Sequence, residues 1–354
     1  MRADLRSGKG IAMSTARCYY IPPHIIDRLL RNARQLDLDA EAIQRTAVAS
    51  QRLREQRRSA SFGNLATLTP PRPGKGDRQI FDNQHQWIVG GPLVRGEGDQ
   101  PVGDAAADAA YDGLGATRQF YRDVLNRDSL DNAGIALQAY VNFGVGFDNA
   151  FWDGTELVFG NGSGQIFKDL TGDIDVIGHE LTHGVTQYTA GLIYTDQPGA
   201  LNESFSDIFG CCVEQFASGQ DAGDFNWLIG EDVMADRLYG EALRSMAHPG
   251  TAYDNAVLGK DPQPDSMAGY VAGGDPHINS GIPNRAFYLA AIELGTVQAA
   301  KIWYGALQNL SPNSQFVDAA RQCGEIARIL ARQGTVARHA AQTVRAAFHE
   351  VGII

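Results

Sequence analysis

Apolar residues recur with a helical period along most of the second half of the chain. This spacing predicts helices over residues 286–307, 316–332 and 338–350, and we expect helical structure generally beyond residue 192. An Ala-rich stretch with spaced aromatic residues predicts another helix over 104–126. Residues 174–185 offer apolar positions for packing and follow Asp173, a residue type that caps helix N-termini.

The first half instead shows short apolar runs and alternation, which are typical of strands. Between residues 78 and 102 such runs lie at 80–81, 87–89 and 93–94, and further strands are expected over 135–141, 149–152 and 157–159. The two patterns segregate along the chain. They predict an α+β fold with a β-rich N-terminal lobe, an α-helical C-terminal lobe, and the 174–185 helix between them at the floor of a cleft.

The first 60 residues form a separate segment, called the leader below. Pro22 and Pro23 precede an apolar stripe and predict a short helix, and a second, basic helix is expected over 39–58. We expect residues 1–17 to be disordered and the Ser-, Thr-, Pro- and Gly-rich stretch 59–76 to be an exposed linker. The predicted domains are residues 1–60, 61–187 and 188–354.

Charge is distributed unevenly between the leader and the rest. Of the net charge of −11, residues 1–60 contribute +6 (12 Lys and Arg, 6 Asp and Glu), so the remainder carries −17. A basic leader docked electrostatically on an acidic body is the interpretation we prefer. A nucleic-acid-binding arm is the alternative; it predicts strongly salt-dependent DNA binding, but the basic residues are scattered rather than clustered.

No apolar stretch is long enough to cross a bilayer, and none follows the basic N-terminal residues, so we expect neither a membrane segment nor a secretory signal peptide. The four cysteines show no disulfide-framework spacing and are expected to be reduced, structural thiols.

The motif His179-Glu180-Leu181-Thr182-His183 carries the chemistry. Residues four apart share one helix face, so His179 and His183 can point at one metal ion. Glu180 can reach the same side and take a proton from metal-bound water, which is the arrangement of a zinc hydrolase. A chance match on a buried helix is the alternative, which the N-cap and the apolar flanks disfavour.

A second helix can complete this site. Glu203 and Asp207 are again four apart; Glu203 can be the third zinc ligand, and Asp207 can accept the N–H of a ligand histidine, for which we favour His179. The fourth metal position then stays open for water. An exposed acidic helix face is the alternative.

These two motifs together resemble the thermolysin family of neutral metallopeptidases. The resemblance extends from about residue 78 to the C-terminus and includes segments 149–154, 192–194, 244–246 and 277–282. It implies that Tyr194 and His277 stabilise the oxyanion that forms when water attacks the scissile carbonyl. The family orients this histidine with an upstream Asp; here that position corresponds to Ala272, and Asp275 is the candidate replacement.

The same resemblance implies the substrate site. Residues Asn149, Ala150, Phe151 and Trp152 would form an edge strand to which a peptide adds. Four residues would line an apolar pocket, and Arg244 would bind the substrate carbonyl beyond it; the four are Phe167, Leu170, Val176 and Leu243. The implied preference is for Leu, Ile, Phe or Val just after the cut.

Family members also bind calcium, and the matching acidic residues are Asp175, Glu214 and Glu231. Two further acidic positions of the family are Asn226 and Leu228 here. Because calcium prefers six to eight oxygen ligands, these losses imply at most one site.

The leader resembles the short propeptides of the protealysin-like branch. This implies an intramolecular inhibitor, removed by self-cleavage somewhere in residues 50–70. Cys18 could block the zinc as a thiolate, or it could be a packing thiol; unchanged zinc coordination after Cys18→Ser would exclude the first hypothesis. We expect a monomer that acts on proteins or peptides, binds neither nucleic acid nor membrane, and either stays in the cell or leaves by a non-classical route, although the family is mostly secreted. A zinc-bound protein without catalysis is the remaining alternative.

Overall fold

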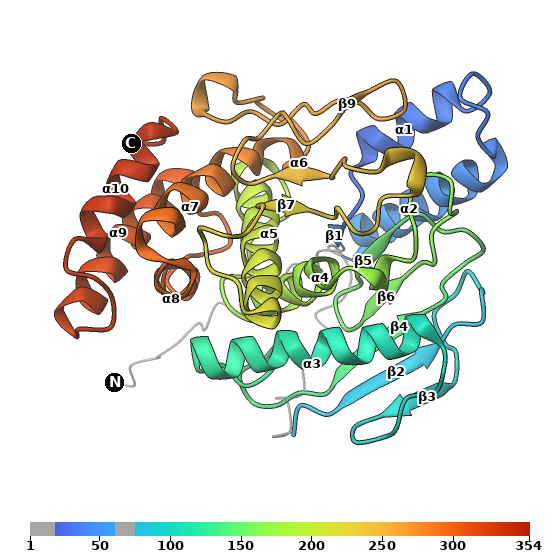
Figure 1. The fold of residues 1–354 in the computed structure, drawn as a ribbon, viewed down its shortest axis with the longest axis horizontal. Helices are drawn as coiled ribbons and strands as arrows, with labels where there is room; N and C mark the ends of the chain where they lie inside the picture. Colours follow the sequence, from blue (N-terminus) through green and yellow to red (C-terminus); the bar gives the residue numbers. More distant parts are fainter. Residues whose placement is uncertain (1–17, 61–74) are drawn as a thin grey trace, which may run out of the picture.

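The computed structural model describes residues 18–60 and 75–354, except for the side chains of Cys18 and residues 53–60. Two lobes meet around a central helix, α4 (Ile174–Gln187), with the leader on one side (Figure 1). The segments 1–17 and 61–74, for which disorder and a linker are predicted, lie outside the described residues.

The N-terminal lobe contains a six-stranded sheet in the order β1-β5-β6-β4-β2-β3. In that order the strands are β1 (Cys18–Tyr19), β5 (Ala150–Trp152), β6 (Leu157–Phe159), β4 (Leu137–Val141), β2 (Arg78–Asp82) and β3 (Leu93–Gly96). The pairs β2–β4 and β4–β6 are parallel, and the other neighbours are antiparallel. Because the leader strand β1 pairs with β5, the expected edge strand lies inside the sheet.

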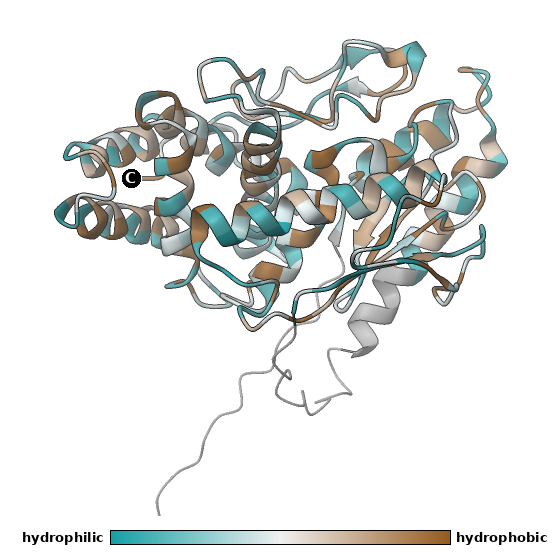
Figure 2. Cartoon of the chain, turned by 60° about the horizontal axis from the view of Figure 1, so that its bottom comes forward, coloured by the Kyte–Doolittle hydropathy of each residue, from teal (hydrophilic) through white to brown (hydrophobic). Residues whose placement is uncertain are grey.

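Helix α3 (Ala105–Leu125) packs against β2, β4 and α4. It begins where Asp104 accepts a hydrogen bond from the amide of Ala107, and it ends at Asn126, which adopts the left-handed conformation. In Figure 2 its ribbon carries hydrophilic and hydrophobic residues in turn, as expected for a helix with one face toward solvent.

The crossing of α4 with α5 (Asp196–Ser218) positions the chemistry. The helices approach closely at Gly178 and Gly210: a Cβ on Gly178 would lie 3.1 Å from the Cα of Gly210. A larger residue at Gly210 would come within 2.8 Å of the carbonyl oxygen of Asp175. Glycine at this crossing therefore allows side chains of both helices to meet.

The C-terminal lobe consists of α5 and five further helices: α6 (Pro276–Asn279), α7 (Gly281–Leu294), α8 (Thr296–Leu307), α9 (Phe316–Arg332) and α10 (Ala340–Glu350). The helix predicted over 286–307 is two helices, because Gly295 between them has a φ of 81°. The prediction that the chain is helical throughout beyond residue 192 is also wrong. Residues 219–275 are mostly loops with short elements: β7 (Leu228–Ile229), η2 (Asp236–Leu238), β8 (Arg244–Ser245), β9 (Asp254–Asn255), β10 (Gly259–Lys260) and η3 (Met267–Gly269).

The leader forms α1 (Pro23–Asn32) and α2 (Ala40–Ala60), so both predicted helices are confirmed, although the second continues past residue 58. Helix α1 buries Ile25, Ile26 and Leu29 in the main core. Arg28 donates hydrogen bonds to the carbonyls of Ala256 and Val257, both at 3.1 Å. These contacts are apolar packing and hydrogen bonds, and electrostatic docking of the leader stays a prediction.

The α+β two-lobe architecture is confirmed. Of the expected strands, only 87–89 is wrong: this stretch is a bend between β2 and β3. No helix within the described ranges is both long and apolar enough to span a membrane.

Candidate active site

Helix α4 presents the first metal-binding side chains. Asp173 caps it by accepting a hydrogen bond from the amide of Asp175 at 3.1 Å. His179, Glu180 and His183 are all buried and bring ligand-type atoms within 4.8 Å of one another. The Nε2 atoms of the two histidines are 3.0 Å apart, so both can face one ion.

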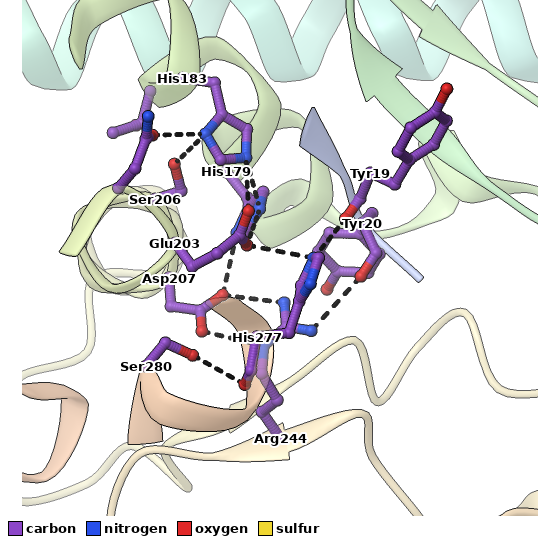
Figure 3. A network of polar contacts seen from close by, with 12 residues as sticks. Tyr19, Tyr20, His179, His183, Glu203, Ser206, Asp207, Arg244, His277 and Ser280 are labelled. Carbon is purple, nitrogen blue, oxygen red and sulfur yellow. Dashed lines mark hydrogen bonds and ion pairs between the residues drawn. The ribbon is translucent and has the colours of Figure 1, made fainter. Parts of the chain in front are cut away.

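Helix α5 supplies the carboxylate of Glu203. Its oxygens lie 3.4 Å from Nε2 of His179 and 3.6 Å from Nε2 of His183. Figure 3 shows the three side chains pointing toward one another. The Oε2 atom of Glu203 is buried without a hydrogen bond in the described part of the protein. Two imidazoles and a carboxylate converging in this way fit a zinc ion.

The Nδ1 atoms of both histidines, on the side of each ring away from the metal position, have polar partners. Asp207 lies 2.9 Å from Nδ1 of His179, as the sequence predicts. Nδ1 of His183 lies 2.9 Å from Oδ1 of Asn202 and 3.0 Å from the hydroxyl of Ser206. Such partners fix the ring orientation and leave Nε2 for the metal. Sequence reasoning missed Asn202 and Ser206, although both are polar residues flanking Glu203 on the same helix.

Asp207 also holds a buried cation. Arg244 donates from Nε and Nη2 to its two oxygens, at 2.9 and 2.8 Å. The amide of Asn284 adds a third hydrogen bond at 2.9 Å. Burial opposes ionisation of Asp207, but Arg244 and His179 outweigh it and lower the pKa of Asp207 to about 2. The carboxylate is therefore charged and rigidly placed behind His179.

Glu180 differs from the other carboxylates of this site. Both of its oxygens are buried without a hydrogen bond among the described residues. Burial raises the pKa of Glu180 to about 8, although His179 acts in the opposite direction. A carboxyl group whose pKa lies near neutrality can both accept and return a proton.

His277 approaches from the C-terminal lobe, on α6. Asp275 caps this short helix, and its carboxylate lies 2.6 Å from Nδ1 of His277. Asp275 therefore makes the contact expected of it as the replacement for the family's upstream Asp. Ala272, the position matching the family's Asp, is exposed. Burial opposes the charged imidazole, but Glu203 and Asp275 raise the pKa of His277. The hydroxyl of Tyr194 contacts Glu203 and lies 3.5 Å from Nε2 of His277.

The leader crosses this site as an extended chain. The amide of Tyr20 donates to the carbonyl of Ala150 at 3.0 Å, and the amide of Ile21 donates to Oδ1 of Asn149 at 2.9 Å. Arg244 donates to the carbonyl of Tyr20 at 3.3 Å. The carbonyl oxygen of Tyr19 lies 2.6 Å from Nε2 of His277 (Figure 3). The Tyr19–Tyr20 peptide bond thus lies beside His277, Arg244 and the metal-binding residues.

Known proteins share this arrangement. Family models described as the catalytic domain and the alpha-helical domain of thermolysin metallopeptidase match residues 49–187 and 190–353. An extracellular metalloprotease of Pectobacterium carotovorum subsp. carotovorum is 44% identical over 321 residues, covering 86% of this chain and 88% of that protein. The chain belongs to the thermolysin family of metallopeptidases.

Two further likenesses refine this membership. Thermolysin of Alicyclobacillus acidocaldarius subsp. acidocaldarius is 36% identical over 286 residues, which cover 77% of this chain but 50% of that protein. The precursor of protealysin from Serratia proteamaculans superposes with a TM-score of 0.80 at 41% identity, covering 95% of this chain and 100% of that chain. Membership of the thermolysin family implies zinc, and the likeness to a precursor identifies a neutral endopeptidase made as a zymogen.

The residues expected to line the pocket of this thermolysin-family protein are all buried; they are Phe167, Leu170, Val176 and Leu243. Gly230, with a φ of 70°, keeps the pocket open: a Cβ there would lie 2.8 Å from the Tyr20 hydroxyl and 2.9 Å from Leu243. Two residues of β5 differ in their contacts. Phe151 contacts the ring of Tyr19 in the leader, whereas the indole N–H of Trp152 donates to Gln187.

The acidic cluster is only partly as the sequence predicts. Asp175 and Glu214 come together with Asp173 rather than with Glu231, which accepts a hydrogen bond from Asn226 at 2.7 Å. Burial raises the pKa of Asp173 to about 6, with repulsion from Asp232 adding to it. Burial also raises the pKa of Glu214 to about 8, with repulsion from Asp173 and Asp232 adding to it.

The hypothesis of zinc blocking by Cys18 stays a prediction, since its side chain lies outside the described residues; its backbone pairs with that of Trp152. Cys211, Cys212 and Cys323 are buried and free, as expected.

Proposed function

We propose that this zinc-dependent endopeptidase uses Glu180 as general base and that its own leader occupies the substrate site until it is removed. One observation carries the proposal: residues 19–21 lie along β5 in an extended, hydrogen-bonded conformation, with the Tyr19 carbonyl at His277. An extended peptide added to a strand is a common mode of recognition that demands no single sequence.

His179, His183 and Glu203 would hold the zinc, with Asp207 orienting His179. When bound there, zinc supplies a Lewis acid that polarises a carbonyl and lowers the pKa of water. Glu180 takes the proton from the attacking water and later gives it to the departing amine.

Tyr194 and His277 donate hydrogen bonds to the oxyanion that forms from the scissile carbonyl. The 2.6 Å contact between His277 and the Tyr19 carbonyl supports this role, because that oxygen occupies the place of the reacting one. Asp275 orients the ring through Nδ1. Asn149 and Arg244 hold the substrate backbone on the far side of the bond, as they hold Ile21 and Tyr20.

The leader, residues 1–60, is proposed to be a propeptide that inhibits in this way and is removed by self-cleavage within residues 50–70. The domain boundary at 60/61 follows from this division, and a second boundary at 187/188 is proposed where α4 ends. The basic charge of the leader and the −17 of the remainder support docking before cleavage. Preference for bulky apolar residues after the cut is supported by the buried pocket around Leu243.

Calcium binding is proposed at no more than one site, formed by Asp173, Asp175 and Glu214. Carboxylate oxygens are the ligands that calcium prefers. We further propose a monomeric enzyme that acts on proteins outside the producing cell, as the name of the Pectobacterium relative suggests, and that binds neither nucleic acid nor membrane.

Glu180→Gln tests the assignment. The variant should bind zinc but lose both casein cleavage and self-processing, so that mass spectrometry finds the intact chain. Wild type treated with a chelator should lose both activities as well. Glu293→Gln makes the same chemical change on the exposed side of α7 and should retain both activities. Cleavage that persists in Glu180→Gln would show that the base is wrongly assigned.

A further inference from the structure

The pocket beside the zinc helix holds a tyrosine in this structure. Tyr20 is fully buried, its ring meets His179 edge-on at 5.2 Å between centroids, and Arg244 lies 5.2 Å from the ring centre. Its backbone is bound as proposed for the first substrate residue after the cut, through Ala150 and Arg244. The side chain therefore occupies the pocket that selects that residue.

The end of this pocket is polar. The hydroxyl of Tyr20 donates a hydrogen bond to Oδ1 of Asp175 at 2.8 Å, within a fully buried environment. The other oxygen of Asp175 accepts from the amide of Gly230 at 2.7 Å. Asp175 belongs to the first turn of α4, the helix that carries His179 and His183. Its carboxylate is thus fixed at the depth that a tyrosine hydroxyl reaches and a leucine side chain does not.

The space for the hydroxyl depends on the absence of a side chain at Gly230, where a Cβ would lie 2.8 Å from the hydroxyl oxygen. Asp173 and Glu214 lie next to Asp175, so carboxyl groups form the polar end of the pocket. When a residue without a hydroxyl enters, the buried Oδ1 atom loses its donor. A site built around a hydroxyl discriminates strongly against analogues that lack it.

We propose that Asp175 makes the enzyme prefer tyrosine over phenylalanine immediately after the scissile bond, so that this pocket selects Tyr as well as bulky apolar residues. This rests on the proposed function, because it takes the leader as bound like a substrate. Asp175 is then a specificity residue. The leader, with Tyr19-Tyr20-Ile21, carries the preferred residue and binds tightly for the same reason.

The test uses the self-processed, zinc-loaded enzyme and internally quenched peptides that differ only in the residue after the bond: Tyr, Phe or Leu. Peptides compete in one mixture, so that the ratio of kcat/KM values does not depend on the fraction of active enzyme. We expect the Tyr peptide to be preferred over the Phe peptide by about tenfold or more. In Asp175→Leu this ratio should fall below about threefold.

A control pair exchanges Tyr for Phe before the bond, at the position of Tyr19; its ratio should be the same in wild type and Asp175→Leu. Should the variant fold poorly, two leader peptides decide instead: Tyr-Tyr-Ile-Pro-Pro should inhibit the wild type about tenfold better than Tyr-Phe-Ile-Pro-Pro. Equal cleavage of the Tyr and Phe peptides by wild type would overturn the inference while leaving the peptidase intact. Cleavage of none of them would overturn the proposed function, and the inference with it.

Discussion

Replacing Asp207 by Asn would leave the buried guanidinium of Arg244 without its counter-charge. The Arg244 side chain is about as buried as any in the protein, at 1% exposure, and Asp207 accepts two of its N–H groups at 2.9 and 2.8 Å. The same carboxylate binds Nδ1 of His179 and the amide of Asn284. One change therefore affects both stability and the metal site.

Removing one partner of a buried ion pair costs about 3–5 kcal/mol, because the remaining charge stays desolvated. Asn can still accept one hydrogen bond, so we expect a loss of about 3 kcal/mol in the free energy of unfolding. Loss of the outer partner of a metal-binding histidine also lowers metal affinity by about 10- to 100-fold.

Urea unfolding in the Glu180→Gln background, where self-cleavage is blocked, measures the first effect. Asp236→Asn is the control, since the Asp236 side chain is fully exposed in its pair with half-exposed Lys168, and its loss should leave the midpoint unchanged. The double variant Asp207→Leu with Arg244→Met should recover much of the stability, because neither charge of this pair remains buried. A loss below about 1 kcal/mol for Asp207→Asn would refute the reasoning.

Three further outcomes are expected. Tyr194→Phe should lower kcat by about 100-fold with little change in KM, in steady-state assays; an effect on KM alone would argue against oxyanion binding. Asn149→Ala should raise KM about tenfold, since two hydrogen bonds to the peptide are lost, and should speed loss of the leader, followed by mass spectrometry. Burial raises the pKa of Asp148 to about 7, so its contribution to stability is present below about pH 4 and is lost as pH rises through 7. Asp148→Asn should therefore be more stable than its parent at pH 8, by at most about 4 kcal/mol, and similar near pH 4; a difference independent of pH in urea titrations would contradict this.

Some features follow from local spacing and were readable from the sequence. A helical period places His179 and His183 on one face, and the same period pairs Glu203 with Asp207. Residue types at helix ends located α3 and α4 to within a residue or two. The break at Gly295 was not foreseen, because apolar spacing continues across a glycine that leaves the helical conformation.

Other features depend on how distant segments cross. Tyr20 and Asp175 are 155 positions apart, and only the docking of the leader across α4 brings the hydroxyl to the carboxylate. Likewise, the acidic cluster contains Asp173 where the sequence predicted Glu231, and this depends on how the loop before α4 packs against α5. Local periodicity determined which side chains share a face; the close crossing at Gly178 and Gly210 decided which faces meet, because nothing in a residue's own neighbourhood encodes the distance between two helices.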